Sequence, residues 1–128
     1  LIDIAPNGVD KVKEKFAYKP RVRLFCGDFF EHEGSYDLII EQTFFCAIPP
    51  VRRKDYAQKM ASLLNENGKI IGLLFDKTFE NQGPPFGGSL TEYKVIFEPY
   101  FTIKTMDKCY NSILPRANSE VFINLIKK

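Results

Sequence analysis

Residues 36–40, with the sequence Y-D-L-I-I, form a nearly continuous apolar run that only Asp37 interrupts. Such a run is typical of a strand that is buried on both faces of a parallel sheet. Residues 69–75, K-I-I-G-L-L-F, form a second run of this kind, and a helix-like segment that opens at Pro49-Pro50 lies between the two. The apolar stripe of that helix consists of Tyr56, Met60, Leu63 and Leu64. Two buried strands joined through a helix predict an α/β fold with a mostly parallel sheet.

The segments on either side continue this alternation. Asn67-Gly68 is predicted to stop the central helix, because both residue types adopt the left-handed conformation readily. The other predicted elements are a strand at residues 1–4, a helix from Pro6 to Lys19-Pro20, a strand at residues 22–26, a short helix that Ser89 and Glu92 open at capping-box spacing, and strands at residues 101–110 and 120–126. The last two strands predict an antiparallel hairpin at the end of one domain, residues 1–128.

Composition excludes several classes of protein. The 128 residues are 45% hydrophobic and 27% charged, with a net charge of +2, which is ordinary for a globular protein. No apolar run approaches the roughly 20 residues of a membrane span. The only compact basic run is Arg52-Arg53-Lys54, so nucleic acid is not an expected partner. Three widely spaced cysteines without a C-x-x-C pair, and a single His32, predict a cytoplasmic protein with no metal site.

Polar residues follow the predicted strands at the edge where α/β proteins bind ligands, outside the carboxyl ends of parallel strands. Asp3 ends the first strand, Asp28 with Phe29 follows the second, and Glu41-Gln42-Thr43 ends the third. A carboxylate at such an end accepts hydrogen bonds from the two hydroxyls of a ribose, and an Asp–aromatic pair suits an adenine. A local alternative stays open for both carboxylates, since Asp3 and Asp28 are also suitable caps for the segments behind them.

Several stretches together resemble class I S-adenosylmethionine-dependent methyltransferases. They are D-I-A-P at residues 3–6, C-G-D-F-F at 26–30, Y-D-L-I-I at 36–40, L-L-N-E-N-G-K at 63–69, and the terminal hairpin. Three further stretches, T-F-F-C-A-I at 43–48, G-P-P-F at 83–86, and N-S-I at 111–113 with Pro115-Arg116, resemble the thiopurine S-methyltransferase family and its halide/thiol branch. The resemblance covers essentially the whole chain. It implies a Rossmann-like fold and S-adenosylmethionine as the cofactor.

The resemblance also implies which residues hold the cofactor. Asp3, with Ile4 beside it, matches the family's acidic residue that binds the ribose hydroxyls, and Asp28 with Phe29 matches the pair beside the adenine. Gln42 falls where the family usually has a tyrosine or arginine that touches the cofactor. A glutamine can still form a hydrogen bond there, although it has neither a ring nor a charge.

Four residues fall near the family's substrate pocket: Phe44, Phe45, Phe86 and Arg116. Core packing is the alternative role for each phenylalanine, and for Phe45 it is the favoured one. Arg116 would suit an anionic substrate, with a solvated loop position as its alternative.

One part of the family pattern is absent. The family's sheet order is 3-2-1-4-5-7-6, and the central strand 1 leads into a glycine-rich loop that approaches the cofactor. This sequence starts at strand 2 and has no G-x-G-x-G segment, since the glycines of residues 83–88 follow strand 5. We therefore expect an incomplete domain that lacks strand 1, with unpaired apolar edges on the two strands that flank it.

The resulting functional hypothesis is in-line methyl transfer from S-adenosylmethionine to a small soft nucleophile: a thiol, a thiopurine, thiocyanate or a halide. A small-molecule O- or N-methyltransferase on the same fold is one alternative. A non-catalytic, truncated binding module is another, and a dinucleotide-binding dehydrogenase is a weaker one. The expected partner is a small molecule, with neither nucleic acid nor a membrane, and the expected state is a monomer or a weak homodimer.

Overall fold

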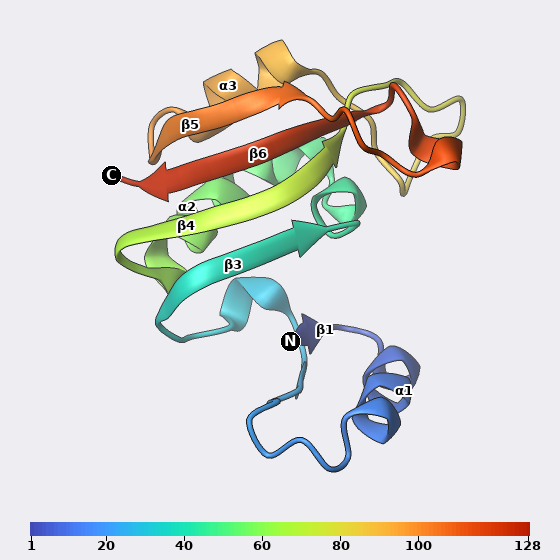
Figure 1. Cartoon of the computed structure of the whole chain (residues 1–128), viewed down its shortest axis with the longest axis vertical. Coiled ribbons are helices and arrows are strands. Elements are labelled where there is room, and N and C mark those ends of the chain that lie inside the picture. The colour runs from blue at the N-terminus through green and yellow to red at the C-terminus, as the bar shows by residue number, and fades with distance from the viewer. The chain divides into compact units, whose positions relative to one another are not determined.

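The order of strands and helices in the computed structural model, which describes all of residues 1–128, agrees with the predicted order. The elements are β1 (Ile2–Asp3), α1 (Pro6–Lys15), β2 (Phe25–Cys26), β3 (Tyr36–Gln42), α2 (Arg53–Leu63), β4 (Leu64–Phe75), α3 (Leu90–Phe97), β5 (Phe101–Lys108) and β6 (Glu120–Lys127) (Figure 1). They form two units, an N-terminal unit of residues 1–34 and a C-terminal unit of residues 35–128.

The N-terminal unit is a parallel strand pair with one helix. β1 pairs with β2, and Asp3 lies opposite Cys26. α1 has a proline in its first turn, where a missing N–H costs nothing, and Lys13 and Lys15 in its last turn, where a positive charge suits the helix dipole. The predicted strand at residues 22–26 was too long, because only Phe25 and Cys26 form it. The backbone N–H of Val22 bonds to the carbonyl of Lys19 in a turn, so this residue is not available to a strand.

The C-terminal unit is a mixed sheet with the strand order β3-β4-β6-β5. β3 and β4 are parallel, whereas β6 runs antiparallel to both β4 and β5. The predicted terminal hairpin is therefore confirmed. The strand orders also agree with the family order that the resemblance implied. If β1 is counted as strand 2 of the family, β2-β1 is the order 3-2 and β3-β4-β6-β5 is the order 4-5-7-6.

The prediction that β3 is buried on both faces was wrong. Leu38 is 47% exposed and Ile40 is 76% exposed. β3 is an edge strand of its sheet, with β4 as its only neighbour. α2 and α3 both lie behind the sheet in Figure 1, so the helices of this unit cover one of its faces.

The core of the C-terminal unit lies between that face and the two helices. Its largest fully buried side chains are Arg53, Tyr56, Tyr93, Phe45, Phe97, Phe101, Ile70, Ile123, Leu125 and Val121. α3 starts as the sequence predicted, because the Ser89 hydroxyl accepts a hydrogen bond from the N–H of Glu92. None of the chain's helices combines the length and the apolar character that a membrane span requires.

The end of α2 differs from the prediction. Asn67-Gly68 was expected to stop this helix, but the helix ends at Leu63, and Leu64 is already extended. Leu64 is buried and pairs with Tyr36 at the start of β3, with an irregular register before the next pair, Leu38 with Lys69. Asn67 does adopt a positive φ of 62°, but within the bend of β4. Burial of Leu64 in the sheet thus outweighs one more helical turn.

Candidate functional site

In the N-terminal unit, Asp3 and Asp28 lie at neighbouring strand ends. The N–H of Gly27, next to Asp28, donates to the carbonyl of Asp3 at 3.0 Å. Asp3 Oδ1 accepts a hydrogen bond from the N–H of Ala5 at 3.0 Å, and Asp28 Oδ1 accepts one from the N–H of Phe30 at 2.9 Å. Both carboxylates therefore cap the turn that follows them, as the local alternative stated. The predicted role in ligand binding would use the carboxylate oxygens that these caps do not engage.

Each cap uses one carboxylate oxygen, and the second oxygen of Asp3 is available to a ligand. A Cβ at Gly8 would lie 3.1 Å from Asp3 Oδ2, so the absence of a side chain at Gly8 leaves room beside this oxygen. A carboxylate oxygen with no hydrogen bond from the chain is the acceptor that a ribose hydroxyl needs. Ile4 is exposed, whereas Phe29 is buried and packs edge-on against Phe30. Of these residues, Asp3 keeps an oxygen beyond its cap that can accept from a ligand hydroxyl.

In the C-terminal unit, one buried carboxylate organises the end of β3. Glu41 is 3% exposed. Its Oε1 accepts hydrogen bonds from the N–H groups of Phe44 at 3.0 Å and Phe45 at 2.9 Å, and its Oε2 accepts one from the Tyr56 hydroxyl at 2.5 Å. Thr43, the first residue after β3, has a positive φ of 58°. Glu41 thus holds the 43–48 turn, which begins at Thr43, against α2.

Burial controls the ionisation of the groups around this turn. It raises the pKa of Glu41, an effect that the hydrogen bonds from Tyr56, Phe45 and Phe44 oppose. It raises the pKa of Tyr56 well above its ordinary value, and the negative charge of Glu41 adds to the effect. Burial also raises the pKa of the Cys46 thiol, and the negative charge of Glu41 raises it further. Cys46 is therefore a neutral thiol near pH 7 and is not an activated nucleophile.

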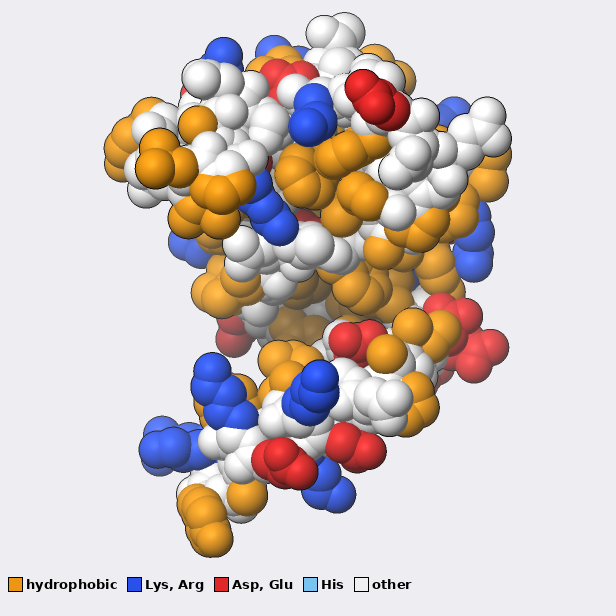
Figure 2. All heavy atoms as spheres, turned by 90° about the vertical axis from the view of Figure 1, so that its right-hand side faces the viewer, with side chains coloured by type: hydrophobic (Ala, Val, Ile, Leu, Met, Phe, Trp, Pro, Cys, Tyr) orange, Lys and Arg blue, Asp and Glu red, His pale blue; other side chains and the backbone are white.

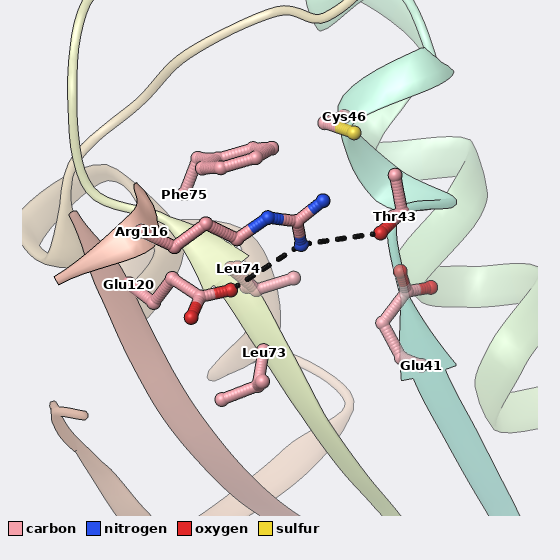
Figure 3. Close-up of a pocket in the computed structure, with 8 residues that line it drawn as sticks. All are labelled: Glu41, Thr43, Cys46, Leu73, Leu74, Phe75, Arg116 and Glu120. Carbon is pink, nitrogen blue, oxygen red and sulfur yellow. Dashed lines mark hydrogen bonds and ion pairs between the residues drawn. The ribbon is translucent and has the colours of Figure 1, made fainter. Parts of the chain in front are cut away.

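A small pocket lies at the carboxyl ends of β3 and β4 (Figure 3). Arg116, from the loop between β5 and β6, reaches across it and places Nη1 3.4 Å from Thr43 Oγ1 and 3.5 Å from Glu120 Oε2. Its guanidinium also lies 5.2 Å from the centre of the Phe75 ring. The lining residues are Glu41, Thr43, Cys46, Leu73, Leu74, Phe75, Arg116 and Glu120. The lining thus holds one cation, Arg116, together with two carboxylates, and Arg116 is paired with one of them, Glu120.

Parts of the three stretches that resemble the thiopurine S-methyltransferase family are in contact with one another near this pocket. Besides the contact between Arg116 and Thr43, the N–H of Phe86 donates to the carbonyl of Cys46 at 2.7 Å. Residues 43–48, 83–86 and 115–116 therefore lie together. Phe44 is half-buried and packs on Tyr56, with ring centres 6.4 Å apart, and Phe86 is half-buried as well. Neither ring is among the residues that line the pocket.

Two other predicted residues have clear positions. Phe45 is 2% exposed and packs on Tyr56, Tyr93 and Phe97, so its predicted core role is confirmed. Gln42 is exposed at the end of β3.

The surface at this end of the C-terminal unit is rich in apolar groups. Figure 2 faces the side towards which β3 and β4 run, and hydrophobic side chains gather there. The loop that supplies Arg116 contributes Ile113, which is 66% exposed, and Leu114, which is 91% exposed. The loop that supplies Arg116 to the pocket therefore also adds apolar surface at this end of the unit.

From the sequence, Glu41 was named only as one of the polar residues that end the third strand, and no site role was predicted for Cys46 or Glu120. A usable sign was present for Glu41, since it is an acidic residue at the end of an apolar run, in the same strand end as Gln42. His32 packs edge-on against Phe25, with ring centres 4.8 Å apart. No group of three or more His, Cys, Asp or Glu side chains is placed to share a metal ion.

Comparisons with known proteins agree with these features. A family model described as thiopurine S-methyltransferase matches residues 3–126. The probable thiol methyltransferase 2 of Arabidopsis thaliana is 36% identical over an alignment of 103 positions that covers 77% of this chain and 46% of that protein. The thiocyanate methyltransferase 1 of Brassica oleracea is 29% identical over an alignment of 125 positions that covers 93% of this chain and 55% of that protein. The chain thus spans about half the length of these relatives.

A solved structure confirms the predicted fold class. An S-adenosylmethionine-dependent methyltransferase from Clostridium acetobutylicum matches with a TM-score of 0.80 and 13% identity, over 98% of this chain and 73% of that one. The chain has the Rossmann-like α/β fold of class I methyltransferases.

Proposed function

Because the chain belongs to the thiopurine S-methyltransferase family, we propose that it acts in S-adenosylmethionine-dependent methyl transfer to a small soft nucleophile: a thiol, a thiopurine, thiocyanate or a halide. The observation that carries this proposal is the position of Arg116, which meets Thr43 beside Phe75 and Cys46 at the strand ends. A guanidinium is weakly hydrated and pairs well with a polarisable anion. The names of the two plant relatives, thiol and thiocyanate methyltransferase, support this acceptor class.

We assign the cofactor to five residues. The free oxygen of Asp3 accepts from the ribose hydroxyls, with Ile4 beside it, while Asp28 and Phe29 bind the adenine and Gln42 supplies a further hydrogen bond. When bound, S-adenosylmethionine supplies a methyl group on a sulfonium, which is already a good electrophile, for in-line displacement. The support for this assignment is the second oxygen of the Asp3 carboxylate, which the cap does not use, and the family match.

The acceptor is assigned to Phe44, Phe86 and Arg116. Arg116 attracts the anion and orients it, and the rings of Phe44 and Phe86 exclude water from it, which strengthens its nucleophilicity. The chain's contribution is thus alignment and dehydration of the acceptor rather than covalent chemistry. We assign no residue as a general base.

We infer further that both units, residues 1–34 and 35–128, belong to one methyltransferase domain, since the family model spans residues 3–126. The proposed location is the cytoplasm, in keeping with three free cysteines. The proposed state is a monomer or a weak homodimer that acts on a small molecule. Burial of Arg53 breaks up the only basic run, Arg52-Arg53-Lys54, which argues against nucleic acid as a partner.

Calorimetric titration with S-adenosylhomocysteine tests the cofactor assignment. Asp3→Asn is the sharpest variant, because the amide oxygen still accepts from the N–H of Ala5 while an NH₂ group replaces the free Oδ2. We expect this variant to bind S-adenosylhomocysteine about tenfold more weakly, because at least one charge-assisted hydrogen bond to the ribose is lost. Asp10→Asn, at an exposed position of α1, is the matched control. No binding to the unmodified chain, or equal binding to Asp3→Asn, would contradict the assignment.

A panel of acceptors tests the substrate class. Thiols, a thiopurine, thiocyanate and iodide should be methylated in preference to hydroxylated and amine acceptors of similar size. Preference for an oxygen or nitrogen acceptor would favour the alternative small-molecule methyltransferase. Cofactor binding without methylation of any acceptor would favour a binding function.

A further inference from the structure

Arg53, the middle residue of the basic run, is buried in the interior of the C-terminal unit. Only 2% of its side chain is exposed. It is the first residue of α2, and its guanidinium spans two other segments. Nη1 donates to Glu92 Oε1 at 2.6 Å, and Nη2 donates to the carbonyl oxygen of Gly87 at 2.7 Å. Arg53 therefore connects α2 to α3 and to the loop of residues 83–88.

Aromatic rings enclose the same guanidinium. It lies 4.8 Å from the centre of the Phe45 ring and 5.8 Å from that of Tyr93. Its Nε is buried without a hydrogen-bond partner. Burial of a charged group is costly, and apolar residues often stabilise a core equally well. Stability alone is therefore a poor explanation for an arginine at this position, whereas its planar fork fixes the direction of two partners.

The carbonyl that Arg53 holds belongs to the residue after Phe86. The N–H of Phe86 donates to the carbonyl of Cys46, and the N–H of Gly88 donates to the carbonyl of Lys77 at 3.0 Å. Gly87 is packed so tightly that a Cβ there would lie 2.0 Å from the carbonyl oxygen of Lys77. The 83–88 loop is thus tied at Phe86, Gly87 and Gly88, and Arg53 supplies the only one of these ties that comes from a side chain.

We propose that Arg53 is a positioning residue of the acceptor site: through the carbonyl of Gly87 it holds Phe86 against the 43–48 turn. This inference rests on the proposed function, and it adds a prediction about acceptors. Acceptors with an aromatic body, such as thiophenol, depend on the position of the Phe86 ring. Thiocyanate, which is small and depends on Arg116, does not.

The first test measures the loop without cofactor or acceptor. Hydrogen exchange at the Phe86 amide should accelerate at least about tenfold in Arg53→Met, because its bond to Cys46 opens more often when the loop is released. Amides of β4 and β6 should keep their protection, which shows that the variant is folded. A lysine at this position can reach one of the two partners but not both. The exchange rate of the Phe86 amide in Arg53→Lys should therefore lie between the rates in the unmodified chain and in Arg53→Met. Arg52→Met, at the exposed neighbouring position, is the matched control.

The second test measures methyl transfer to thiophenol and to thiocyanate. In Arg53→Met we expect KM for thiophenol to rise about tenfold with little change in kcat, and KM for thiocyanate to change less than about threefold. Arg53→Lys should restore part of the loss. An equal loss with both acceptors, or unchanged exchange at Phe86, would overturn the inference. If the unmodified chain methylates neither acceptor and binds no S-adenosylhomocysteine, the proposed function is wrong, and so is the role of Arg53 in acceptor binding. The exchange measurement would then still decide whether Arg53 holds the 83–88 loop.

Discussion

The Tyr56 hydroxyl donates a hydrogen bond of 2.5 Å to Glu41, and this contact joins α2 to the end of β3 inside the core. Glu41 also accepts from two backbone N–H groups of the turn that follows. A single carboxylate therefore satisfies three buried donors and gives the 43–48 turn its conformation. That turn carries Thr43 and Cys46, which line the pocket.

Replacement of Glu41 by alanine should destabilise the chain by about 3 kcal/mol, because three buried donors lose their acceptor. Glu41→Gln should cost much less, since the amide oxygen still accepts from the backbone and its NH₂ group can donate to the Tyr56 oxygen. Urea unfolding of both variants checks this order. A smaller loss for Glu41→Ala than for Glu41→Gln would show that the hydrogen bonds are not what matters.

The dependence of stability on pH should reveal Glu41 as well. Its pKa is raised by burial in the folded chain, so the folded state holds its proton more tightly than the unfolded state. The stability that this provides is present in full below the ordinary value of 4.5 and is lost as the pH rises through the folded pKa. Glu41→Gln has no such proton. Its stability relative to the unmodified chain should therefore increase as the pH rises from 4.5, and unfolding series across that range measure it.

Tyr56→Phe should destabilise the chain by about 1 to 2 kcal/mol, through the loss of a buried hydrogen bond to a charged acceptor. It should also raise the pKa of Glu41 further, since the bond from Tyr56 lowers that pKa. Tyr18→Phe is the control, because Tyr18 is 95% exposed. Infrared measurement of the Glu41 carboxyl band reports the pKa, and a downward change would contradict the assignment of the bond.

Gly72→Ala should destabilise the sheet by about 2 kcal/mol or more, because overpacking forces the backbone to move. Gly72 lies opposite Glu41 in the β3–β4 pair, and a Cβ there would come within 2.6 Å of the Glu41 carbonyl oxygen. Gly27→Ala offers a matched control, since a Cβ at Gly27 meets nothing within 4 Å. Thermal unfolding compares the two. Equal stability of both variants would mean that β3 and β4 can move apart to accept a Cβ at position 72 with no loss of stability.

Arg116→Lys should raise KM for thiocyanate several-fold, about the effect of exchanging a planar guanidinium for a point charge, and Arg116→Met should raise it further. Lys104→Met, on the exposed side of β5, is the control for net charge. Because Arg116 also pairs with buried Glu120, the melting temperature of each variant needs to be measured alongside. An unchanged KM in Arg116→Met would remove Arg116 from the acceptor site.

Sequence alone determined the order of the elements, because each depends on local patterns: the proline of α1, the Ser89 cap of α3 and the apolar run of β4 all act over a few residues. It also predicted a place for Arg116 near the acceptor, through the stretch that carries the family resemblance, and that role stays a prediction. Tertiary structure decided the rest. The pairing of Leu64 with Tyr36 accounts for the end of α2 at Leu63, and the position of β3 at the edge of its sheet leaves Ile40 exposed.

The same division applies to the site. Arg52 and Arg53 are chemically identical neighbours in the sequence, yet Arg52 lies at the surface and Arg53 is enclosed by Phe45, Tyr93, Glu92 and Gly87. Partners that are 34 and 39 residues away make this difference, and no local pattern records them. Burial also turns Glu41 from one more strand-end carboxylate into the acceptor for three donors, because a desolvated charge has to find all of its partners within the fold.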